Sequence, residues 1–251
     1  MSELPVYEYL PGGWPPHGEQ SWEHGALAAE MAAKFTAFRR MLKRKGPLNA
    51  YPGSPDQARV GGHNVAMTLG YVLARAMRDA PHLRVLDWGG SLGHTALLAG
   101  ALYPDLKIDL TVKEVAAICD FGRMATHGVR YETDDAACFA REYDLAMASG
   151  SLHCVEDWRS ILAQLARVAK PWLYITRLPV THDAPSYVLI QRPPGSPISY
   201  PCWVLNRDEF LDAAAATGVV LEREFVVDLA ADAQGAPAPA LINGFLLRAP
   251  N

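Results

Sequence analysis

Short apolar runs alternate with segments of helical spacing between residues 83 and 177. The apolar runs are LRVLDW, KIDLTV, GVRYET, YDLAMAS and KPWLYITR, and the helical segments between them are LGHTALLAGALY, EVAAICDFGRMATH and DWRSILAQLARVA. Such alternation is typical of a parallel sheet with helices packed on both faces. We therefore predict an α/β fold for this part of the chain.

Two amphipathic helices are predicted ahead of this region. One runs from Ala26 to Lys43, and its apolar face consists of Leu27, Met31, Phe35, Phe38 and Leu42. The second runs from about Arg59 to Ala80, with an apolar stripe of Val65, Leu69, Val72 and Ala76. Residues 1–24 are rich in Pro, Gly, Trp and Tyr without periodicity, which indicates an irregular arm that packs as a flap. We expect residues 1–82 to form an N-terminal arm and helical cap, and residues 83–251 to form the core.

One helix and two further strands are predicted after a Pro-rich insertion over residues 178–203. Asn206, with Glu209 three residues later, resembles a capping box at the start of the helix RDEFLDAAAATG. The runs VVLEREFVVDL and ALINGFLLRA are separated by a short loop, AADAQGAPAP, which has no room for a crossover helix. We therefore expect these two strands to pair antiparallel.

Composition narrows the range of partners. The chain has 251 residues, a net charge of −4 and a pI of about 6.1, so it has no general attraction to nucleic acid. No apolar run reaches the ~18 residues that span a bilayer, and the first residues lack the layout of a secretion signal, so we expect a cytoplasmic protein without membrane contact. The cysteines are far apart, which favours neither a metal site nor a disulfide framework; they are Cys119, Cys138, Cys154 and Cys202.

The glycine turn in VLDWGGSLGHTALL is the main candidate for a ligand site, because ligands of open α/β sheets bind at the carboxyl ends of the strands. The turn does not match the dinucleotide pattern G-x-G-x-x-G, and no Lys followed by Ser or Thr marks a phosphate loop. Asp87 with Gly89, Gly90 and Gly93 suits a ligand that carries a cationic group, such as S-adenosylmethionine. Glu114 follows the next strand, 21 residues after Gly93, where a carboxylate can accept both hydroxyls of a ribose. The alternative is a turn without a ligand, in which Asp87 caps the loop or the next helix.

At these residues the chain resembles the class I S-adenosylmethionine-dependent methyltransferases, over roughly residues 83–248. More narrowly, it is similar to a set of bacterial methyltransferases often associated with polysaccharide or secondary-metabolite gene clusters, through the segments YLPGGW, DWGGSLGH, TVKEV, SGSLHCVEDW, ITRLPV, YVLIQRP and WVLNRDEF. The resemblance implies a Rossmann-like class I methyltransferase fold, with a seven-stranded, mostly parallel sheet that contains one antiparallel strand. It also implies a role in natural product biosynthesis.

The resemblance implies a set of cofactor-binding positions. The acid and glycines of the turn would line the methionine part of the cofactor, Glu114 would hold the ribose, and Asp134 or Asp135 would meet the adenine amine. Ser149 and Gly150 would face the reactive end of the cofactor. The full set is Asp87, Trp88, Gly89, Gly90, Gly93, Glu114, Val115, Asp134, Asp135, Ser149 and Gly150. The chain departs from the family at Ser91, which stands where the middle glycine of the motif is usual.

Methyl transfer from a sulfonium chiefly requires that a nucleophile be aligned with the methyl group, and a base assists an oxygen nucleophile of high pKa. His153 is the first candidate for this base, because it follows the fourth strand, and His182 in the insertion is the second. A packing histidine and a solvated loop histidine are the respective alternatives. His94 is expected to cap or line the glycine turn.

The expected activity is S-adenosylmethionine-dependent methylation of a hydroxyl or similar nucleophile on a small metabolite or saccharide, with S-adenosylhomocysteine as product. Candidate substrate residues beside the insertion are Arg177, Tyr187, Gln191, Tyr200 and Trp203, although aromatic residues next to a sheet are also ordinary core material. The residues after the fourth predicted strand are SGSL, whereas enzymes of this class that methylate nucleic-acid amines usually have an N/D-P-P-Y/F tetrapeptide there. This difference favours a small molecule or sugar unit over DNA. The rival function is an S-adenosylmethionine-binding protein with a structural, regulatory or non-methylating catalytic role. The sequence leaves open whether the chain forms a homodimer.

Overall fold

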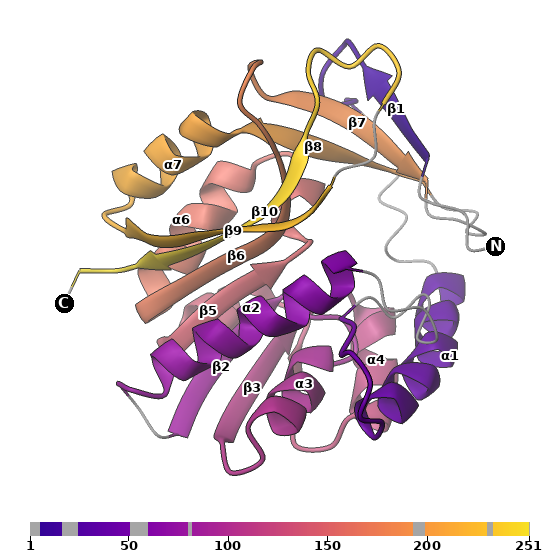
Figure 1. Ribbon diagram of the computed structural model, residues 1–251, viewed down its shortest axis with the longest axis vertical. Helices are drawn as coiled ribbons and strands as arrows, with labels where there is room; N and C mark the ends of the chain where they lie inside the picture. The colour runs from indigo at the N-terminus through magenta and orange to yellow at the C-terminus, as the bar shows by residue number, and fades with distance from the viewer. Residues whose placement is uncertain are drawn as a thin grey trace.

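A mostly parallel sheet forms the centre of the computed structural model, which describes residues 6–16, 25–50, 60–79, 82–192, 199–229 and 233–250, with the backbone alone for residues 25–30 and Leu229. Its core strands are β2 (His82–Trp88), β3 (Lys107–Lys113), β4 (Arg130–Glu132), β5 (Tyr143–Ser149), β6 (Ala169–Thr181), β9 (Val220–Leu229) and β10 (Leu241–Arg248). Their order is β4-β3-β2-β5-β6-β10-β9, and β10 is antiparallel to both neighbours (Figure 1). The predicted α/β class and a seven-stranded core with one antiparallel strand are confirmed.

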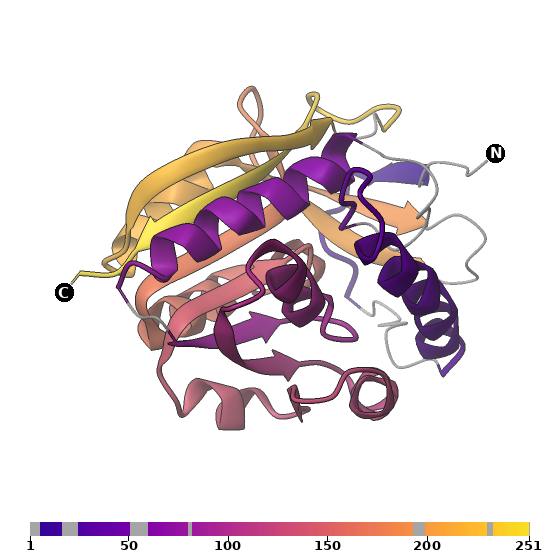
Figure 2. The ribbon, with the colours of Figure 1, turned by 60° about the horizontal axis from the view of Figure 1, so that its bottom comes forward.

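Helices cover both faces of this sheet. One face carries α1 (Gly25–Leu42), α2 (Val60–Ala76), α3 (His94–Leu102) and α4 (Ala116–Ala125), and the other carries α5 (Asp135–Phe139), α6 (Trp158–Val168) and α7 (Arg207–Ala216). Successive residues of a strand point to opposite faces of the sheet and so pack in different hydrophobic clusters. In β5, Leu145 and Met147 pack under α1–α4, whereas Ala146 and Ala148 pack under α5–α7. Figure 2 shows β9 as the outermost strand on its side, with α2 lying alongside it.

The apolar stripes predicted for the first helices are the faces that the fold buries. Phe35 and Phe38 of α1 are buried, as is the whole predicted stripe of α2, which consists of Val65, Leu69, Val72 and Ala76. The side chain of Leu27 lies outside the described residues. The predicted cap of α7 also forms, because the side chain of Asn206 accepts hydrogen bonds from the backbone amides of Asp208 and Glu209.

Three further strands, which were not predicted from the sequence, extend the sheet to ten. They are β1 (Val6–Leu10), β7 (Tyr187–Arg192) and β8 (Tyr200–Asn206). β1 pairs antiparallel with β7, β7 pairs antiparallel with β8, and β8 joins the end of β6 at Val180 and Thr181. The prediction of an irregular N-terminal arm is thus wrong at Val6–Leu10, since β1 and β7 satisfy each other's backbone hydrogen bonds across a large distance in sequence.

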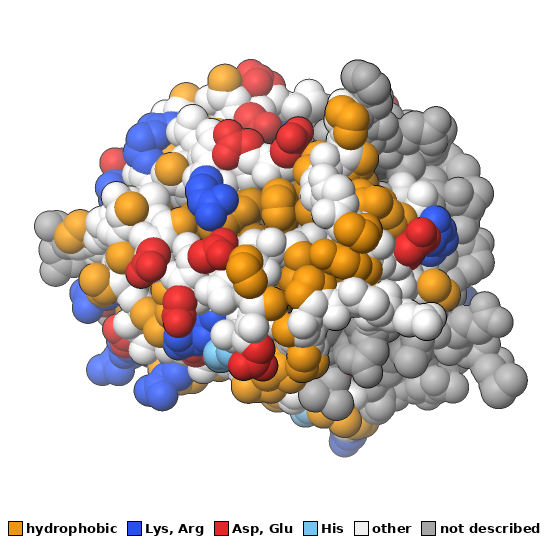
Figure 3. Space-filling model, turned by 90° about the horizontal axis from the view of Figure 1, so that it is seen from above, with side chains coloured by type: hydrophobic (Ala, Val, Ile, Leu, Met, Phe, Trp, Pro, Cys, Tyr) orange, Lys and Arg blue, Asp and Glu red, His pale blue; other side chains and the backbone are white. Residues whose placement is uncertain are grey.

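The loop between β9 and β10 packs on this extension. Tyr187, Leu189, Cys202 and Val204 form a small cluster, and the alanines that contact it from the loop are Ala233, Ala236 and Ala240. The hydroxyl of Tyr187 donates to the carbonyl of Ala238 at 2.7 Å. Figure 3 looks down on this end of the molecule and shows apolar side chains gathered over the middle of the face.

Neither a membrane-spanning helix nor a cluster suited to a metal ion occurs in the described part of the chain. Its helices are too short or too polar to cross a bilayer. Its His, Cys, Asp and Glu side chains do not gather in groups of three or more that could hold an ion. All four cysteines are free thiols, and three of them are buried.

Candidate functional site

The glycine turn between β2 and α3 depends on a left-handed backbone at three positions. Gly89, Ser91 and Gly93 have φ values of 74°, 55° and 76°. A Cβ atom at Gly89 would collide with the side chain of Ser151, and one at Gly90 would lie 2.6 Å from Cγ of Asp87. The sequence therefore needs glycine here both for conformation and for the close approach of backbone to neighbouring side chains.

Ser91 takes the left-handed conformation that a glycine would adopt in its place. Its backbone amide donates to Oε1 of Glu114 at 3.1 Å, so the turn is tied directly to the end of β3. Its Oγ atom is buried, and no partner for it lies among the described residues. The departure from the family's glycine spacing therefore leaves the path of the turn intact, at the conformational cost of a serine in a glycine-like region.

Asp87 is a buried carboxylate with one oxygen left open. It is 2% exposed, and Oδ2 accepts a hydrogen bond of 2.6 Å from the hydroxyl of Thr95 in α3. Oδ1 is also buried, and the described residues supply no partner for it. The pKa of Asp87 is raised to about 6, chiefly by burial. The Thr95 hydrogen bond and Arg177 oppose this rise, whereas Glu114 contributes to it. Such a group is suited to a cationic ligand.

Glu114 is held in place by backbone amides. Oε1 accepts from Ser91 and Oε2 accepts from Val115, at 3.1 and 3.0 Å. Burial raises the pKa of Glu114, and these two amide hydrogen bonds partly offset that effect. Each carboxylate oxygen has a second lone pair, so the fixed group can still accept hydrogen bonds from a ligand.

The other acids predicted for the cofactor have local partners. The indole of Trp88 packs in the core under α5–α7, and its Nε1 donates to Oδ1 of Asp135 at 2.7 Å. Lys113 lies 3.4 Å from the other oxygen of Asp135 and 5.4 Å from the centre of the Trp88 ring. Asp134 is exposed and caps α5 by accepting from the amide of Ala136. Each of these acids thus has a structural role, and contact with adenine stays a prediction.

At the end of β5, Gly150 and Arg177 come together. Gly150 has a φ of 74°, and its amide donates to the carbonyl of Thr176 at 2.9 Å, directly after Ser149. A Cβ atom at Gly150 would lie 3.0 Å from Cζ of Arg177. Arg177, which lies in β6, has a left-handed φ of 55°. Its guanidinium therefore rests against the backbone where the reactive end of a cofactor was expected.

Two histidines, the buried His153 and the half-buried His94, lie near this guanidinium. His153 lies in a short 3-10 helix, η2 (Leu152–Cys154), is 6% exposed, and has an Nδ1 atom without a partner among the described residues. Burial and, to a smaller extent, the charge of Arg177 together lower its pKa to about 3. His94 contacts the rings of Phe35 and Phe38, both at 4.8 Å, and the same two causes lower its pKa to about 4. Both imidazoles are neutral at physiological pH.

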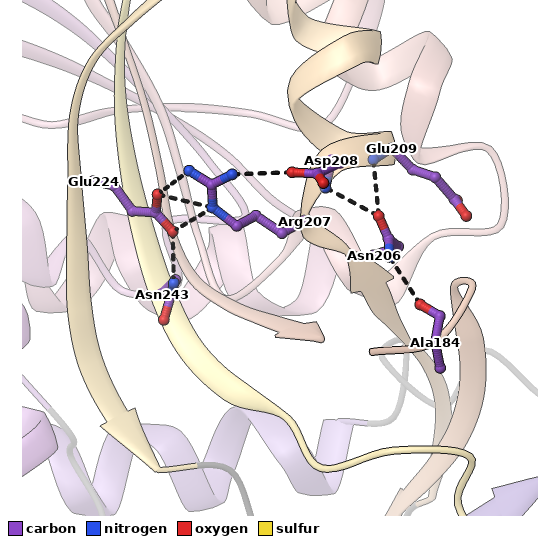
Figure 4. A network of polar contacts seen from close by, with 7 residues as sticks. All are labelled: Ala184, Asn206, Arg207, Asp208, Glu209, Glu224 and Asn243. Carbon is purple, nitrogen blue, oxygen red and sulfur yellow. Dashed lines mark hydrogen bonds and ion pairs between the residues drawn. The ribbon is translucent and has the colours of Figure 1, made fainter. Parts of the chain in front are cut away.

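His182 lies in a different environment. It is exposed just beyond the end of β6, and its charge acts on Glu224 of β9. Glu224 accepts hydrogen bonds from Arg207, the shortest of 2.6 Å, and from the amide of Asn243 at 2.8 Å (Figure 4). The structure thus groups His182 with this surface network, whereas His153 is grouped with Arg177.

The candidate substrate residues separate into two groups. Gln191 of β7 and Tyr200 of β8 are cross-strand partners, and Gln191 also pairs with Tyr7 of β1, which was not a candidate. The three side chains therefore share one face of the extension. Trp203 lies on the other face, where it stacks on Trp14 at 5.7 Å and donates to the carbonyl of Glu156. The phenol of Tyr187 is engaged with Ala238, as described above.

Three residues of the site were not singled out from the sequence. Thr95 binds the carboxylate of Asp87, and the Oγ atom of Ser151 donates to the carbonyl of Trp88 at 2.6 Å. Tyr7 reaches the extension through β1. A helix residue one turn past the glycines could have suggested Thr95, but no local signal indicates that residues 6–10 pair with β7.

The strand order, with one antiparallel strand inside an otherwise parallel core, is the fold of the class I S-adenosylmethionine-dependent methyltransferases. The N-terminal domain of EvdMO1, solved in the presence of S-adenosylhomocysteine and D-fucose, aligns with a TM-score of 0.54 and 16% identity over 88% of this chain and 97% of that one. The 1,6-didemethyltoxoflavin-N1-methyltransferase of Burkholderia thailandensis, with S-adenosylhomocysteine bound, aligns at 0.53 and 14% identity over 98% and 100%. Magnesium protoporphyrin IX methyltransferase of Synechocystis gives 0.53 and 14% over 90% and 99%.

These likenesses are structural. No protein-family model matches the sequence, and no curated protein matches it either. The comparisons therefore establish the fold, and the chemistry has to be argued from the residues of this chain.

Proposed function

We propose that this chain is an S-adenosylmethionine-dependent methyltransferase that acts on a hydroxyl or similar nucleophile of a small molecule or saccharide. The observation that carries the proposal is the pair of carboxylates, Asp87 and Glu114, on either side of the left-handed glycine turn. One has a buried oxygen without a partner among the described residues, and the other is fixed by two amides. This arrangement in a methyltransferase fold favours a cationic nucleoside over a phosphate ligand.

The residues present fit such a cofactor. Oδ1 of Asp87 is available for the ammonium group of the methionine part, and the lone pairs of Glu114 are available for the two ribose hydroxyls. Gly89, Gly90 and Gly93 would line the methionine part together with Trp88, whose side chain is turned into the core, and Val115 beside Glu114. Asp134 or Asp135 is proposed to contact the adenine amine, and Ser149 and Gly150 are proposed to face the reactive end of the cofactor.

When bound, S-adenosylmethionine supplies an activated methyl group, so the chain needs to align and desolvate the acceptor. We propose that Nδ1 of the neutral His153 accepts a hydrogen bond from the acceptor hydroxyl and orients its lone pair. With a pKa of about 3 this imidazole is a weak base, so alignment is its main contribution. His182 is the second candidate for this role, and Arg177, Tyr187, Gln191, Tyr200 and Trp203 are proposed for the acceptor.

The acceptor class follows from the small-molecule character of the related structures and from the acidic balance of this chain. Among the solved structures above, one was determined in the presence of D-fucose, and another has 1,6-didemethyltoxoflavin bound. A hydroxyl acceptor, a role in natural product biosynthesis, a cytoplasmic location and a homodimer are predictions from the sequence that we retain. Nucleic acid is not proposed as a substrate, given a net charge of −4.

Calorimetric titration tests the cofactor site. Wild-type protein should bind S-adenosylmethionine and S-adenosylhomocysteine, and Glu114→Gln should weaken S-adenosylhomocysteine by about 10- to 100-fold, since hydrogen bonds to a charged group contribute about 1.5–3 kcal/mol. Adenosine should lose affinity in the same variant, whereas adenine should not. Glu142→Gln, an exposed carboxylate at the start of β5, is the matched control. An equal loss for adenosine and adenine would remove Glu114 from the ribose.

Turnover separates the proposal from its rival, an S-adenosylmethionine-binding protein without methyl transfer. Radiolabelled S-adenosylmethionine is incubated with a panel of hydroxylated metabolites and sugars, and transfer of label to one acceptor is expected. Tight binding without transfer to any acceptor would favour the rival. With an acceptor in hand, His153→Ala and His182→Ala are compared, and we expect the larger fall in kcat from His153→Ala.

A further inference from the structure

Arg177 has an unusual position for a charged side chain. Its backbone is left-handed, with φ of 55°, a conformation that is rare for residues other than glycine and costs of order 1–3 kcal/mol. Its guanidinium lies against the backbone of Gly150, where any Cβ atom would approach Cζ to 3.0 Å. Arg177 and Gly150 therefore both have a left-handed backbone, and together they place the guanidinium at the carboxyl ends of β5 and β6. Retained strain of this kind is concentrated at functional sites.

A row of polar side chains lies on one face of the extension. Tyr7, Gln191 and Tyr200 stand side by side across β1, β7 and β8. Tyr200 is 8% exposed, and burial raises its pKa; the other groups acting on that pKa include Cys154 of η2, Tyr7 and Arg177. β8, the strand of Tyr200, packs against η2, which also carries His153. The row adds two phenols and an amide to the wall of the site.

Arg177 places a positive charge near the proposed cofactor site, where it acts on the carboxylate of Asp87 and on His153. The proposed cofactor carries a positive sulfonium, and a second cation close to it is unfavourable in a site with little water. A carboxylate between the two would be attracted to both, and its two oxygens match the guanidinium fork. The same carboxylate would offset one of the two causes that depress the pKa of His153, and so would make that histidine more basic when substrate is bound.

We propose that the acceptor is a hydroxylated carboxylic acid, whose carboxylate binds Arg177 while the Tyr7–Gln191–Tyr200 row contacts its polar body. The inference rests on the proposed methyltransferase function and adds the substrate class to it. Tyr7 becomes a specificity-determining residue, contributed by the N-terminal strand. The competing occupant of Arg177 is the carboxylate of the cofactor itself, and the experiment separates the two.

The first arm compares cofactor fragments in wild type and Arg177→Gln. S-Adenosylhomocysteine carries the amino-acid carboxylate, and 5′-methylthioadenosine lacks it. We expect the affinities of both to change by less than about twofold in the variant. A tenfold or larger loss for S-adenosylhomocysteine, with methylthioadenosine unchanged, would assign Arg177 to the cofactor and overturn the proposal. Arg78→Gln, an exposed arginine at the far end of α2, is the control.

The second arm measures thermal stability with paired probes at about 10 mM, with and without S-adenosylhomocysteine. The pairs are 4-hydroxybenzoate with 4-hydroxybenzamide, and galacturonate with galactose. We expect at least one carboxylate to raise Tm by about 2 to 4 °C in wild type, its neutral partner to have no effect, and Arg177→Gln to abolish the shift. Tyr7→Phe should reduce it, whereas Tyr71→Phe on α2 should not. Equal shifts for both members of each pair, a shift that survives in Arg177→Gln, or no shift with either carboxylate would overturn the proposal.

A folding defect and a failed cofactor site remain distinguishable in these data. Asn tolerates a left-handed backbone, so Arg177→Asn removes the charge with less strain and should behave as Arg177→Gln does. If wild type binds no S-adenosylhomocysteine, the proposed function is wrong. The carboxylate shifts measured without that ligand then decide the anion site by themselves.

Discussion

Replacing Asp87 by Asn should stabilise the ligand-free protein while it weakens the cofactor site. The carboxylate is buried, and burial raises its pKa from 3.8 to about 6. A shift of about two units corresponds to about 3 kcal/mol, at 1.36 kcal/mol per unit, which the folded state loses when Asp87 is ionised. The amide oxygen of Asn can still accept the hydroxyl of Thr95. Asp87→Asn should therefore raise the free energy of unfolding at pH 7.5 by up to about 3 kcal/mol.

The sign and the pH window follow from the raised pKa. Above about pH 6 the carboxylate is ionised in both the folded and the unfolded chain, so wild type bears the full cost there. Between about pH 6 and pH 4 the folded chain takes up a proton that the unfolded chain does not, and wild type recovers stability as the pH falls. The advantage of Asp87→Asn should thus be complete above about pH 6 and absent by about pH 4.

Urea denaturation at a series of pH values provides the measurement. The difference between variant and wild type is plotted against pH, because other titrating groups cancel in that difference. Calorimetry with S-adenosylhomocysteine at pH 7.5 should show at least tenfold weaker binding to Asp87→Asn, since the ammonium group loses its charged partner. A variant that is less stable than wild type at pH 7.5, or a stability difference that does not change with pH, would refute the reasoning.

Three further substitutions test the turn and the surface network, each by urea denaturation. Ser91→Gly should gain about 1 kcal/mol, because glycine adopts the φ of 55° freely, and it should leave cofactor affinity unchanged; a loss of stability would contradict the strain argument. Gly93→Ala should cost about 2 kcal/mol or more, since φ is 76° and the new Cβ would lie 2.7 Å from the hydroxyl of Tyr131; a neutral effect would show that the turn relaxes freely. At Glu224, burial raises the pKa, but the hydrogen bonds from Arg207 and Asn243 outweigh burial, so the net pKa is lowered. The stabilising contribution of Glu224 is therefore present at neutral pH and lost in acid. Glu224→Gln should therefore cost about 1 kcal/mol at pH 7 and little once the pH falls below the lowered pKa of Glu224. A cost that does not depend on pH would assign the effect to packing.

The core of the fold could be predicted from the sequence because its signals are local. Each core strand is a short apolar run beside a helical stripe, and the cap of α7 is encoded within four residues, from Asn206 to Glu209. The extension carries no such signal. Pro201 interrupts the pattern of β8, and β1 is defined only by its partner β7, which no property of residues 6–10 indicates. The sequence does not indicate these three strands because the extension depends on pairing between segments that are far apart in the chain.

The candidate site divides in the same way. Asp87, Gly93 and Glu114 follow from an acid, a glycine pattern and a strand spacing, all visible in one stretch of sequence. The left-handed backbone of Arg177 and its contact with Gly150 follow from packing, since arginine has no preference for that conformation. The engagement of Asp135 by Trp88 likewise needs the tertiary fold, because the two residues are 47 positions apart.

The pairing of β1 with β7 has a kinetic consequence. Arg192 of β7 and Glu8 of β1 form an ion pair although they are 184 positions apart, so closing this chain segment carries a large entropic cost and the contact has a high contact order. The pocket proposed for the nucleoside is formed by residues 87–150, so it can assemble before the first strand docks. Opening of that strand would then expose only the acceptor half, which favours an ordered sequence in which the nucleoside enters first and departs last.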